Sequence, residues 1–281
     1  MISVFTSCDK LDVNNPQKKI RLIYRESNST SKHLSEEWHW DSNLLTSIDY
    51  YKYSSREQTL DYTVHFFYTD GKLTRVILGN SGVELQITHN QYGYDKMNYF
   101  ENGVLVAEFK YRYGNAKIIN IDVTYINNTS YASEQAMSAL SFILPQVVAR
   151  NVVDNIPHHT DVQSKVKSVM SDVNTTTYSF IYKDNNVIKM TITDKSGSQD
   201  YNYKYDSKNN PYYNSPLSPS VNLWVGYSVN NIVEESGYDF LNNASVSTYS
   251  YLYDGSWPIK VYSNTRNDYS ERSEITYYEY Y

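Results

Sequence analysis

The chain has 281 residues, of which 40% are hydrophobic and 20% charged, and 31 are tyrosine. The formal net charge is −6 at pH 7 and the sequence contains no basic run, so it lacks the electrostatic basis for nucleic-acid binding. The most apolar stretch, residues 136–153, is interrupted by serine, proline, glutamine, arginine and asparagine, whereas a membrane-spanning helix needs about 20 mostly apolar residues. We therefore expect neither a nucleic-acid partner nor a transmembrane helix.

The single cysteine, Cys8, ends the run Val-Phe-Thr-Ser-Cys, in which apolar residues precede small ones. This run resembles the lipobox of bacterial lipoproteins, in which the cysteine thiol is acylated and the cysteine becomes the mature N-terminus. Residues 1–7 lack Lys and Arg and fall short of a full signal peptide, so the alternative is a chance cysteine in a terminal tail. We predict that residues 1–19 hold a signal remnant, a lipidated Cys8 and a polar tether.

From residue 20 onward, apolar and polar residues alternate with a period of two, as in residues 105–113 and 201–206. This period is typical of β-strands with one apolar and one polar face. Turn sequences that accept positive φ angles separate the runs, among them Asp70-Gly71, Asn102-Gly103 and Asp254-Gly255. The pattern predicts a meander of hairpins whose apolar faces are rich in tyrosine.

One segment departs from this period. Within residues 133–144, apolar side chains recur at helical spacing, and Pro145 then ends or kinks the helix. Thr160 and Gln163 resemble a capping box before a second helical run. We predict a helical insertion at about residues 131–172. It would cover one end or edge of the sheet, or alternatively act as a gate or plug with a ligand role.

Roughly sixteen strands can be counted, about nine before the insertion and seven after it. They predict an all-β single domain over residues 20–281, either a large antiparallel up-and-down barrel or a strongly curved sheet. Closure is favoured because it removes the exposed edges of a sheet. Tyrosine is spread along the strands rather than confined to two girdles, so we expect a water-soluble barrel rather than an outer-membrane porin.

Four predicted hairpins share one sequence pattern: two aromatic residues with any residue between them, then a polar turn, then an aliphatic residue that starts the next strand. They lie at residues 38–44, 66–73, 180–187 and 251–259. With Cys8 and the polar tether, they resemble a family of lipoproteins of unknown function from Bacteroides-type bacteria, which has a porin-like fold. They are more distantly similar to the Tyr-Asp repeats of secreted bacterial toxins and shell proteins. The resemblance covers most of residues 20–281 and implies a wide, tethered β-barrel. It implies no catalytic residue.

No motif for catalysis, metal binding or a cofactor is evident. The histidines show no helical pair with a glutamate, and His158, His159 and Asp161 are better explained as a solvated loop. Nucleophile elbows and phosphate-binding glycine loops are missing from the sequence. We therefore expect a protein that is not an enzyme and that uses no metal or cofactor. A glycoside hydrolase remains an alternative, because the distance between paired carboxylates is a tertiary property; the available glutamates are Glu36, Glu37, Glu84, Glu101 and Glu108.

The aromatic side chains are the remaining candidates for a functional site. We predict ligand-binding positions at Trp38, His39, Trp40, Trp224 and Trp257, where rings would stack on a ligand while neighbouring polar groups bind its hydroxyls. The structural alternative is that the aromatic rows pack the barrel wall. The predicted function is non-enzymatic binding of a glycan or another small apolar or amphipathic ligand by an outer-membrane-anchored lipoprotein, on the periplasmic face or the cell surface. A scaffold that docks a partner protein through aromatic strand faces is the alternative.

Overall fold

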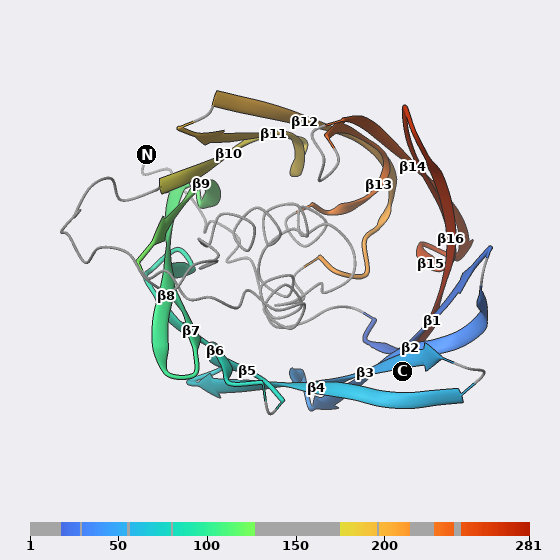
Figure 1. Cartoon of the computed structure of the whole chain (residues 1–281), viewed down its shortest axis with the longest axis horizontal. Helices are drawn as coiled ribbons and strands as arrows, with labels where there is room; N and C mark the ends of the chain where they lie inside the picture. Colours follow the sequence, from blue (N-terminus) through green and yellow to red (C-terminus); the bar gives the residue numbers. More distant parts are fainter. Residues whose placement is uncertain are drawn as a thin grey trace, which may run out of the picture.

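A computed structural model describes residues 18–28, 30–54, 57–79, 81–126, 175–195, 197–213, 228–238 and 243–281. Over these ranges the chain forms sixteen strands in one closed antiparallel barrel, in which each strand pairs with its neighbours in the chain and β1 pairs with β16 (Figure 1). The predicted all-β barrel is confirmed, with β1 to β9 before the middle of the chain and β10 to β16 after it.

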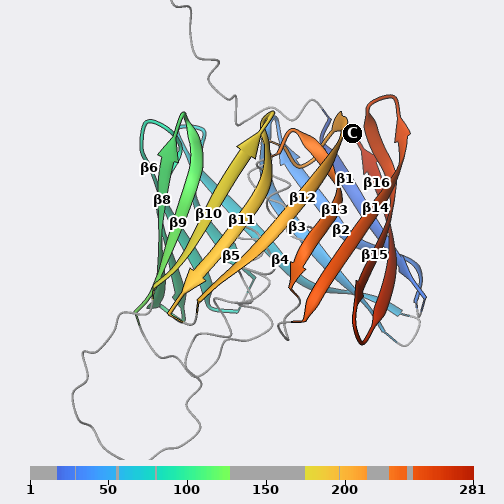
Figure 2. The same cartoon turned by 90° about the horizontal axis from the view of Figure 1, so that it is seen from above.

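The strands are tilted relative to the barrel axis, as closure of a sheet requires (Figure 2). Their bounds are β1 (Ile20–Ser27), β2 (Thr30–Asp41), β3 (Leu44–Ser54), β4 (Glu57–Thr69), β5 (Lys72–Leu78), β6 (Val83–His89), β7 (Tyr94–Glu101), β8 (Val104–Gly114), β9 (Lys117–Tyr125), β10 (Thr175–Lys183), β11 (Asn186–Asp194), β12 (Gly197–Asn209), β13 (Asn230–Tyr238), β14 (Ala244–Asp254), β15 (Trp257–Asn267) and β16 (Glu271–Tyr280).

The predicted helical insertion at residues 131–172 lies outside the described residues, as do Cys8 and most of the predicted tether. Within the described part of the chain, no helix has the length and apolar character needed to cross a membrane.

The barrel interior holds the core, and tyrosine makes up much of it. Along β12, Tyr201 and Tyr203 are buried, whereas Asp200, Asn202 and Lys204 between them are exposed. The same alternation runs through most strands, so one face of each strand points inward and the other faces solvent. Inward tyrosines supply apolar area to a chain with few aliphatic residues, and their hydroxyl groups still need hydrogen-bond partners.

Many of those partners are backbone carbonyls of the preceding strand. Near the end of seven even-numbered strands, an aromatic ring donates a hydrogen bond to a carbonyl oxygen near the start of the strand before it. The pairs are Trp40 with Ile20, Tyr68 with Leu45, His89 with Leu73, Tyr182 with Ile118, Tyr205 with Val187, Tyr251 with Ile232 and Tyr280 with Pro258, at 2.6 to 2.9 Å. We call this set the ring–carbonyl belt. It gives a structural reason for an aromatic residue just before the turn in several hairpins.

Tight turns join many of the strands. Two consecutive residues with positive φ, the signature of a type I′ hairpin turn, occur at Asp70-Gly71, Asn102-Gly103, Asn115-Ala116 and Asp184-Asn185. The first two confirm the turns predicted from Asp-Gly and Asn-Gly pairs. The Asn115-Ala116 turn is unexpected, because alanine has a Cβ atom and rarely adopts the left-handed region.

Replacing this alanine is expected to stabilise the barrel. Ala116 has φ of 58°, a conformation that costs a residue with Cβ about 1–2 kcal/mol, so Ala116→Gly should raise the free energy of unfolding by about 0.5–1 kcal/mol after the entropic cost of glycine. Urea unfolding measures this change. Ala244→Gly is the control: it replaces an exposed strand alanine outside the left-handed region and should destabilise the protein. A loss of stability in both variants would contradict the prediction.

Candidate functional site

The structure places the predicted aromatic residues on different faces of the barrel wall. Trp38 and Trp40 point inward from β2, and Trp257 begins β15 and packs against Tyr280 of β16. His39, which lies between the two tryptophans, points outward. Trp224 lies outside the described residues.

The inward rings form one continuous row. Consecutive ring centroids are 6.0 to 6.4 Å apart in the order Trp40, Trp38, Tyr212, Tyr278, Tyr280, Trp257. Trp38 is completely buried and donates its Nε1 hydrogen to Glu36 Oε2 at 3.0 Å, so its ring has no face free for a ligand. Of the predicted aromatic positions, Trp40 and Trp257 are half-buried and keep some access to solvent.

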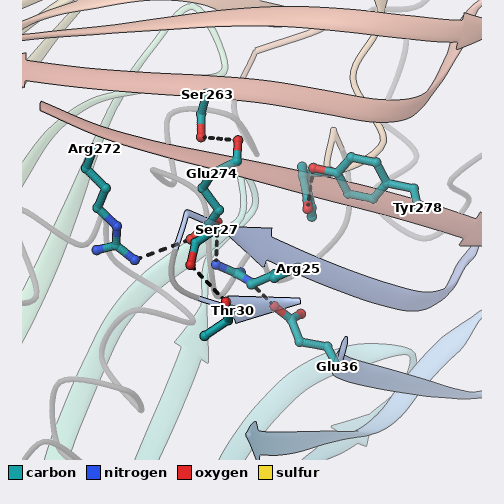
Figure 3. Close-up of polar contacts among 9 residues, drawn as sticks. Arg25, Ser27, Thr30, Glu36, Ser263, Arg272, Glu274 and Tyr278 are labelled. Carbon is teal, nitrogen blue, oxygen red and sulfur yellow. Dashed lines mark hydrogen bonds and ion pairs between the residues drawn. The ribbon is translucent and has the colours of Figure 1, made fainter. Parts of the chain in front are cut away.

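An ion-pair network lies beside this row (Figure 3). Arg25 of β1 contacts Glu36 Oε1 at 3.1 Å and Glu274 Oε1 at 3.1 Å, and Arg272 contacts Glu274 Oε2 at 3.4 Å. The Glu36 side chain is 1% exposed and that of Arg25 is 23% exposed. Burial opposes the charge on Arg25, but the two carboxylates outweigh it and raise the pKa of the guanidinium. The network holds β1, β2 and β16 together at the junction where the barrel closes.

Behind this network, the outer face of the wall is hollowed. A depression of about 300 Å³ spans β14, β15, β16 and β1. Its outward-facing lining includes Thr248, Ser250, Tyr262, Asn264, Ser273 and Ile275. We call it the outer hollow. Glu26, Ser27, Asn28, Ser263 and Glu274 complete the lining. In Figure 3, Ser27, Ser263 and Glu274 lie together at the ion-pair network.

The chemistry of the outer hollow is amphipathic. Tyr262 is 41% exposed, and Lys260 Nζ lies 4.5 Å from the centre of its ring. Asn264 donates its Nδ2 hydrogen to Glu271 Oε1 at 2.7 Å, but its Oδ1 atom is buried and has no hydrogen-bond partner in the described structure. An exposed ring beside hydroxyl and amide groups is the combination expected of a small-ligand site.

Sequence reasoning missed the outer hollow. Its polar side chains occupy the outward positions of strands whose inward positions hold the conspicuous tyrosines, such as Tyr249 and Tyr251. The only available signal was the recurrence of serine and threonine in residues 244–250, which is common on any solvated strand.

Each of the five glutamates available to the glycoside hydrolase alternative has a neighbour that binds its carboxylate. Glu36 is paired with Arg25, Glu37 accepts a hydrogen bond from Tyr51, and Glu101 accepts one from Tyr99. Hydrogen bonds from Arg75 lower the pKa of Glu84. Burial opposes a similar decrease at Glu108, but Lys96 and Lys110 lower its pKa. A glycosidase acid needs a raised pKa, so Glu84 and Glu108 have the wrong shift for that role.

The described structure is therefore that of a closed sixteen-stranded antiparallel barrel with an aromatic interior and a small polar hollow on its outer wall. No protein-family model matches the chain, and no curated protein matches its sequence. Among solved structures, the chain is similar to a porin-like protein from Bacteroides uniformis ATCC 8492, with 11% identity, 93% of this chain and 98% of that chain covered, and a TM-score of 0.55.

A porin-like protein from Bacteroides vulgatus ATCC 8482 has 7% identity, covers 94% of this chain and 99% of its own, and gives a TM-score of 0.42. A LolA superfamily protein from Nitrosomonas europaea has 9% identity and a TM-score of 0.22, over 96% of this chain and 88% of its own. The likeness to the Bacteroides uniformis protein confirms the porin-like fold. Membership of the lipoprotein family and the likeness to Tyr-Asp repeats stay predictions.

Proposed function

We propose that this protein binds a carbohydrate without catalysis, at the outer hollow, in the bacterial cell envelope. The observation that carries the proposal is the lining of the hollow, where the exposed Tyr262 ring and Ile275 lie beside hydroxyl and amide side chains. A sugar presents both an apolar face and hydroxyl groups, which match such a lining. A volume of about 300 Å³ is at the lower end for ligand pockets, so the hollow suits one sugar unit, free or within a longer chain.

The charged side chains of the outer wall support our proposal that the barrel lies in water rather than in lipid. Cross-strand ion pairs recur around it, including the bidentate pair Arg75 with Glu84 at 2.7 and 2.8 Å, Arg112 with Asp122 at 2.9 Å, and Lys204 with Glu234 at 2.8 Å. A membrane-embedded barrel needs an apolar outward band, in which such charges are costly. The lipobox-like run before Cys8 supports a lipid anchor as the membrane attachment, with the barrel held in the aqueous envelope.

A glycan array followed by calorimetry tests the proposal. We expect Tyr262→Ala to weaken binding of the retained glycan about tenfold, a loss of about 1.4 kcal/mol, because stacking on the ring is removed. Phe67→Ala is the matched control, since Phe67 is an outward, 44% exposed aromatic residue on β4 that does not line the hollow. Its affinity should equal that of the wild type.

Trp40→Ala and Trp257→Ala complete the experiment. Loss of binding in these variants, with Tyr262→Ala unaffected, would place the ligand at the inward aromatic row and overturn the assignment to the outer hollow. A broad array that retains no glycan would overturn the carbohydrate proposal.

A partner-docking scaffold is the second candidate. Val246, Leu252 and Ile259 are 40 to 50% exposed on β14 and β15, the strands that carry part of the hollow. Exposed apolar side chains on one surface are typical of interaction sites when they are contiguous. Crosslinking in the native envelope, followed by capture, distinguishes this function: one partner protein lost on Leu252→Ser, with no glycan bound, would favour docking.

A further inference from the structure

Two carboxylates face each other on the outer wall without a lysine or arginine between them. Glu37 of β2 and Asp49 of β3 are directly opposite in the antiparallel pairing. Among the ion pairs of the described residues, Glu37 takes part in none, and Asp49 is paired only with His39. Like charges directly opposite across two strands destabilise a sheet. Several other acidic residues of the outer wall are paired with Lys or Arg, as in the pair of Lys189 with Asp200. A bound cation would offset the repulsion between Glu37 and Asp49, for which the described structure provides only the imidazole of His39.

His39 completes a set of three metal-ligating side chains at this position. Its Nε2 atom lies 2.9 Å from Asp49 Oδ2, and ligand atoms of Glu37, His39 and Asp49 all lie within 4.8 Å of one another. The His39 side chain is 39% exposed and that of Asp49 is 23% exposed, so a metal ion could reach them from solvent and keep bound water. A zinc ion bound here would replace the hydrogen bond between His39 Nε2 and Asp49 Oδ2, with each ligand atom about 2.0–2.2 Å from the metal.

The two carboxylates are also oriented by neighbouring hydroxyl groups. Thr63 Oγ1 of β4 donates to Asp49 Oδ1 at 2.6 Å, and Tyr51 of β3 donates to Glu37 Oε2 at 3.2 Å. Each of these bonds uses the carboxylate oxygen that points away from the proposed ligand set: Glu37 Oε1 is left for a metal ion, and Asp49 Oδ2 lies against His39 Nε2. Metal-ligating carboxylates are commonly held by such outer hydrogen bonds, which fix the ligand geometry.

We propose that Glu37, His39 and Asp49 bind a divalent transition-metal ion, of which Zn²⁺ is the probe, with water in the open coordination position. One imidazole and two carboxylates form a mixed nitrogen and oxygen set suited to such ions. This site differs from the expectation, drawn from the sequence, that the protein uses no metal. The ligands come from two strands, and Glu37 and His39 follow the two-residue period of a strand rather than the helical spacing of common zinc motifs.

Calorimetric titration of the full chain with Zn²⁺ tests the site. We expect the affinity of this site to fall at least 100-fold in His39→Ala, and about 10-fold in Thr63→Val, which removes an orienting hydrogen bond but no ligand. His33→Ala is the control, because His33 lies on β2 but outside the ligand set, and its loss should leave the affinity unchanged. Zn²⁺ should also raise the melting temperature of the wild type and of His33→Ala, but not that of His39→Ala.

Co²⁺ supplies a spectroscopic readout. An absorption band from protein-bound Co²⁺ that disappears in His39→Ala would support the site. The proposal is overturned if millimolar Zn²⁺ does not bind, or if it binds wild type and His39→Ala equally, since the metal would then be held elsewhere. His39 would in that case serve only as an ion-pair partner of Asp49.

Discussion

At about pH 11, the barrel is expected to have lost most of its free energy of unfolding, because its interior tyrosines cannot ionise while they stay buried. Burial raises the pKa of Tyr94 and Tyr278 to about 12, and it raises the pKa of Tyr50, Tyr99, Tyr111, Tyr178, Tyr203 and Tyr212 well above the ordinary value. In the unfolded chain, each of these phenols titrates near pH 10. Their full contribution to stability is present below pH 10 and is lost as the pH rises toward the folded pKa values.

The size of this effect follows from the linkage between ionisation and folding. One pH unit above the unfolded pKa, each tyrosine that stays neutral in the barrel costs about 1.4 kcal/mol, so the eight named tyrosines together cost about 11 kcal/mol. That sum matches the whole stability of a typical domain, about 5–15 kcal/mol.

Urea unfolding across the alkaline range, with tyrosinate absorbance recorded in parallel, measures the loss. We expect the absorbance of most tyrosines to rise in one step together with unfolding. Gradual ionisation near pH 10 with the near-ultraviolet circular dichroism of the folded protein retained would contradict the prediction, because it would mean that the tyrosines titrate within the intact barrel.

Breaking the buried ion pair should have the second large effect. Arg25→Met leaves Glu36, whose side chain is 1% exposed, without its cation, and we expect the free energy of unfolding to fall by about 3–5 kcal/mol. The double variant Arg25→Met/Glu36→Gln should recover much of this loss. Its glutamine carries no charge and can still accept the Trp38 Nε1 hydrogen.

Arg75→Met provides the matched control on the outer wall. It also removes an arginine from a close carboxylate pair, but the Arg75 side chain is 47% exposed, so the loss should stay below about 1 kcal/mol. Equal losses in Arg25→Met and Arg75→Met, or no recovery in the double variant, would show that burial of Glu36 is not what makes its ion pair important.

Much of the fold could be predicted because local sequence encodes it. Alternation along residues 201–206 fixes which side chains share a face, and Asp70-Gly71 fixes a two-residue turn, so strand number and antiparallel order follow from neighbouring residues. Closure of the sheet into a barrel could be expected because a free sheet edge exposes unpaired backbone groups. The Asn115-Ala116 turn escaped prediction because the barrel imposes a conformation that alanine does not favour on its own.

The candidate sites were less predictable because they depend on register between strands. Trp38 and Trp40 have similar sequence contexts, yet only the packing of Tyr212 and Glu36 makes Trp38 inaccessible. Glu37 and Asp49 meet because β2 and β3 pair in one register, and a shift of one residue would separate them. The outer hollow likewise depends on the curvature of four strands, for which the sequence holds no direct signal.

The pairing of β1 with β16 also determines how the chain must fold. Every other pairing joins strands that are consecutive in the chain. Most of these strands are separated by short turns, so their hairpins can form early and locally; the exceptions are β9 with β10 and β12 with β13, which are separated by residues 126–174 and 210–229. This last pairing brings together residues as distant as Arg21 and Glu279, and closing a loop of that length costs about 5 kcal/mol of chain entropy. Until it forms, both edges have unpaired backbone groups that other copies of the chain can bind. The greatest risk of misassembly therefore falls late in folding, before β1 and β16 of the same chain have paired.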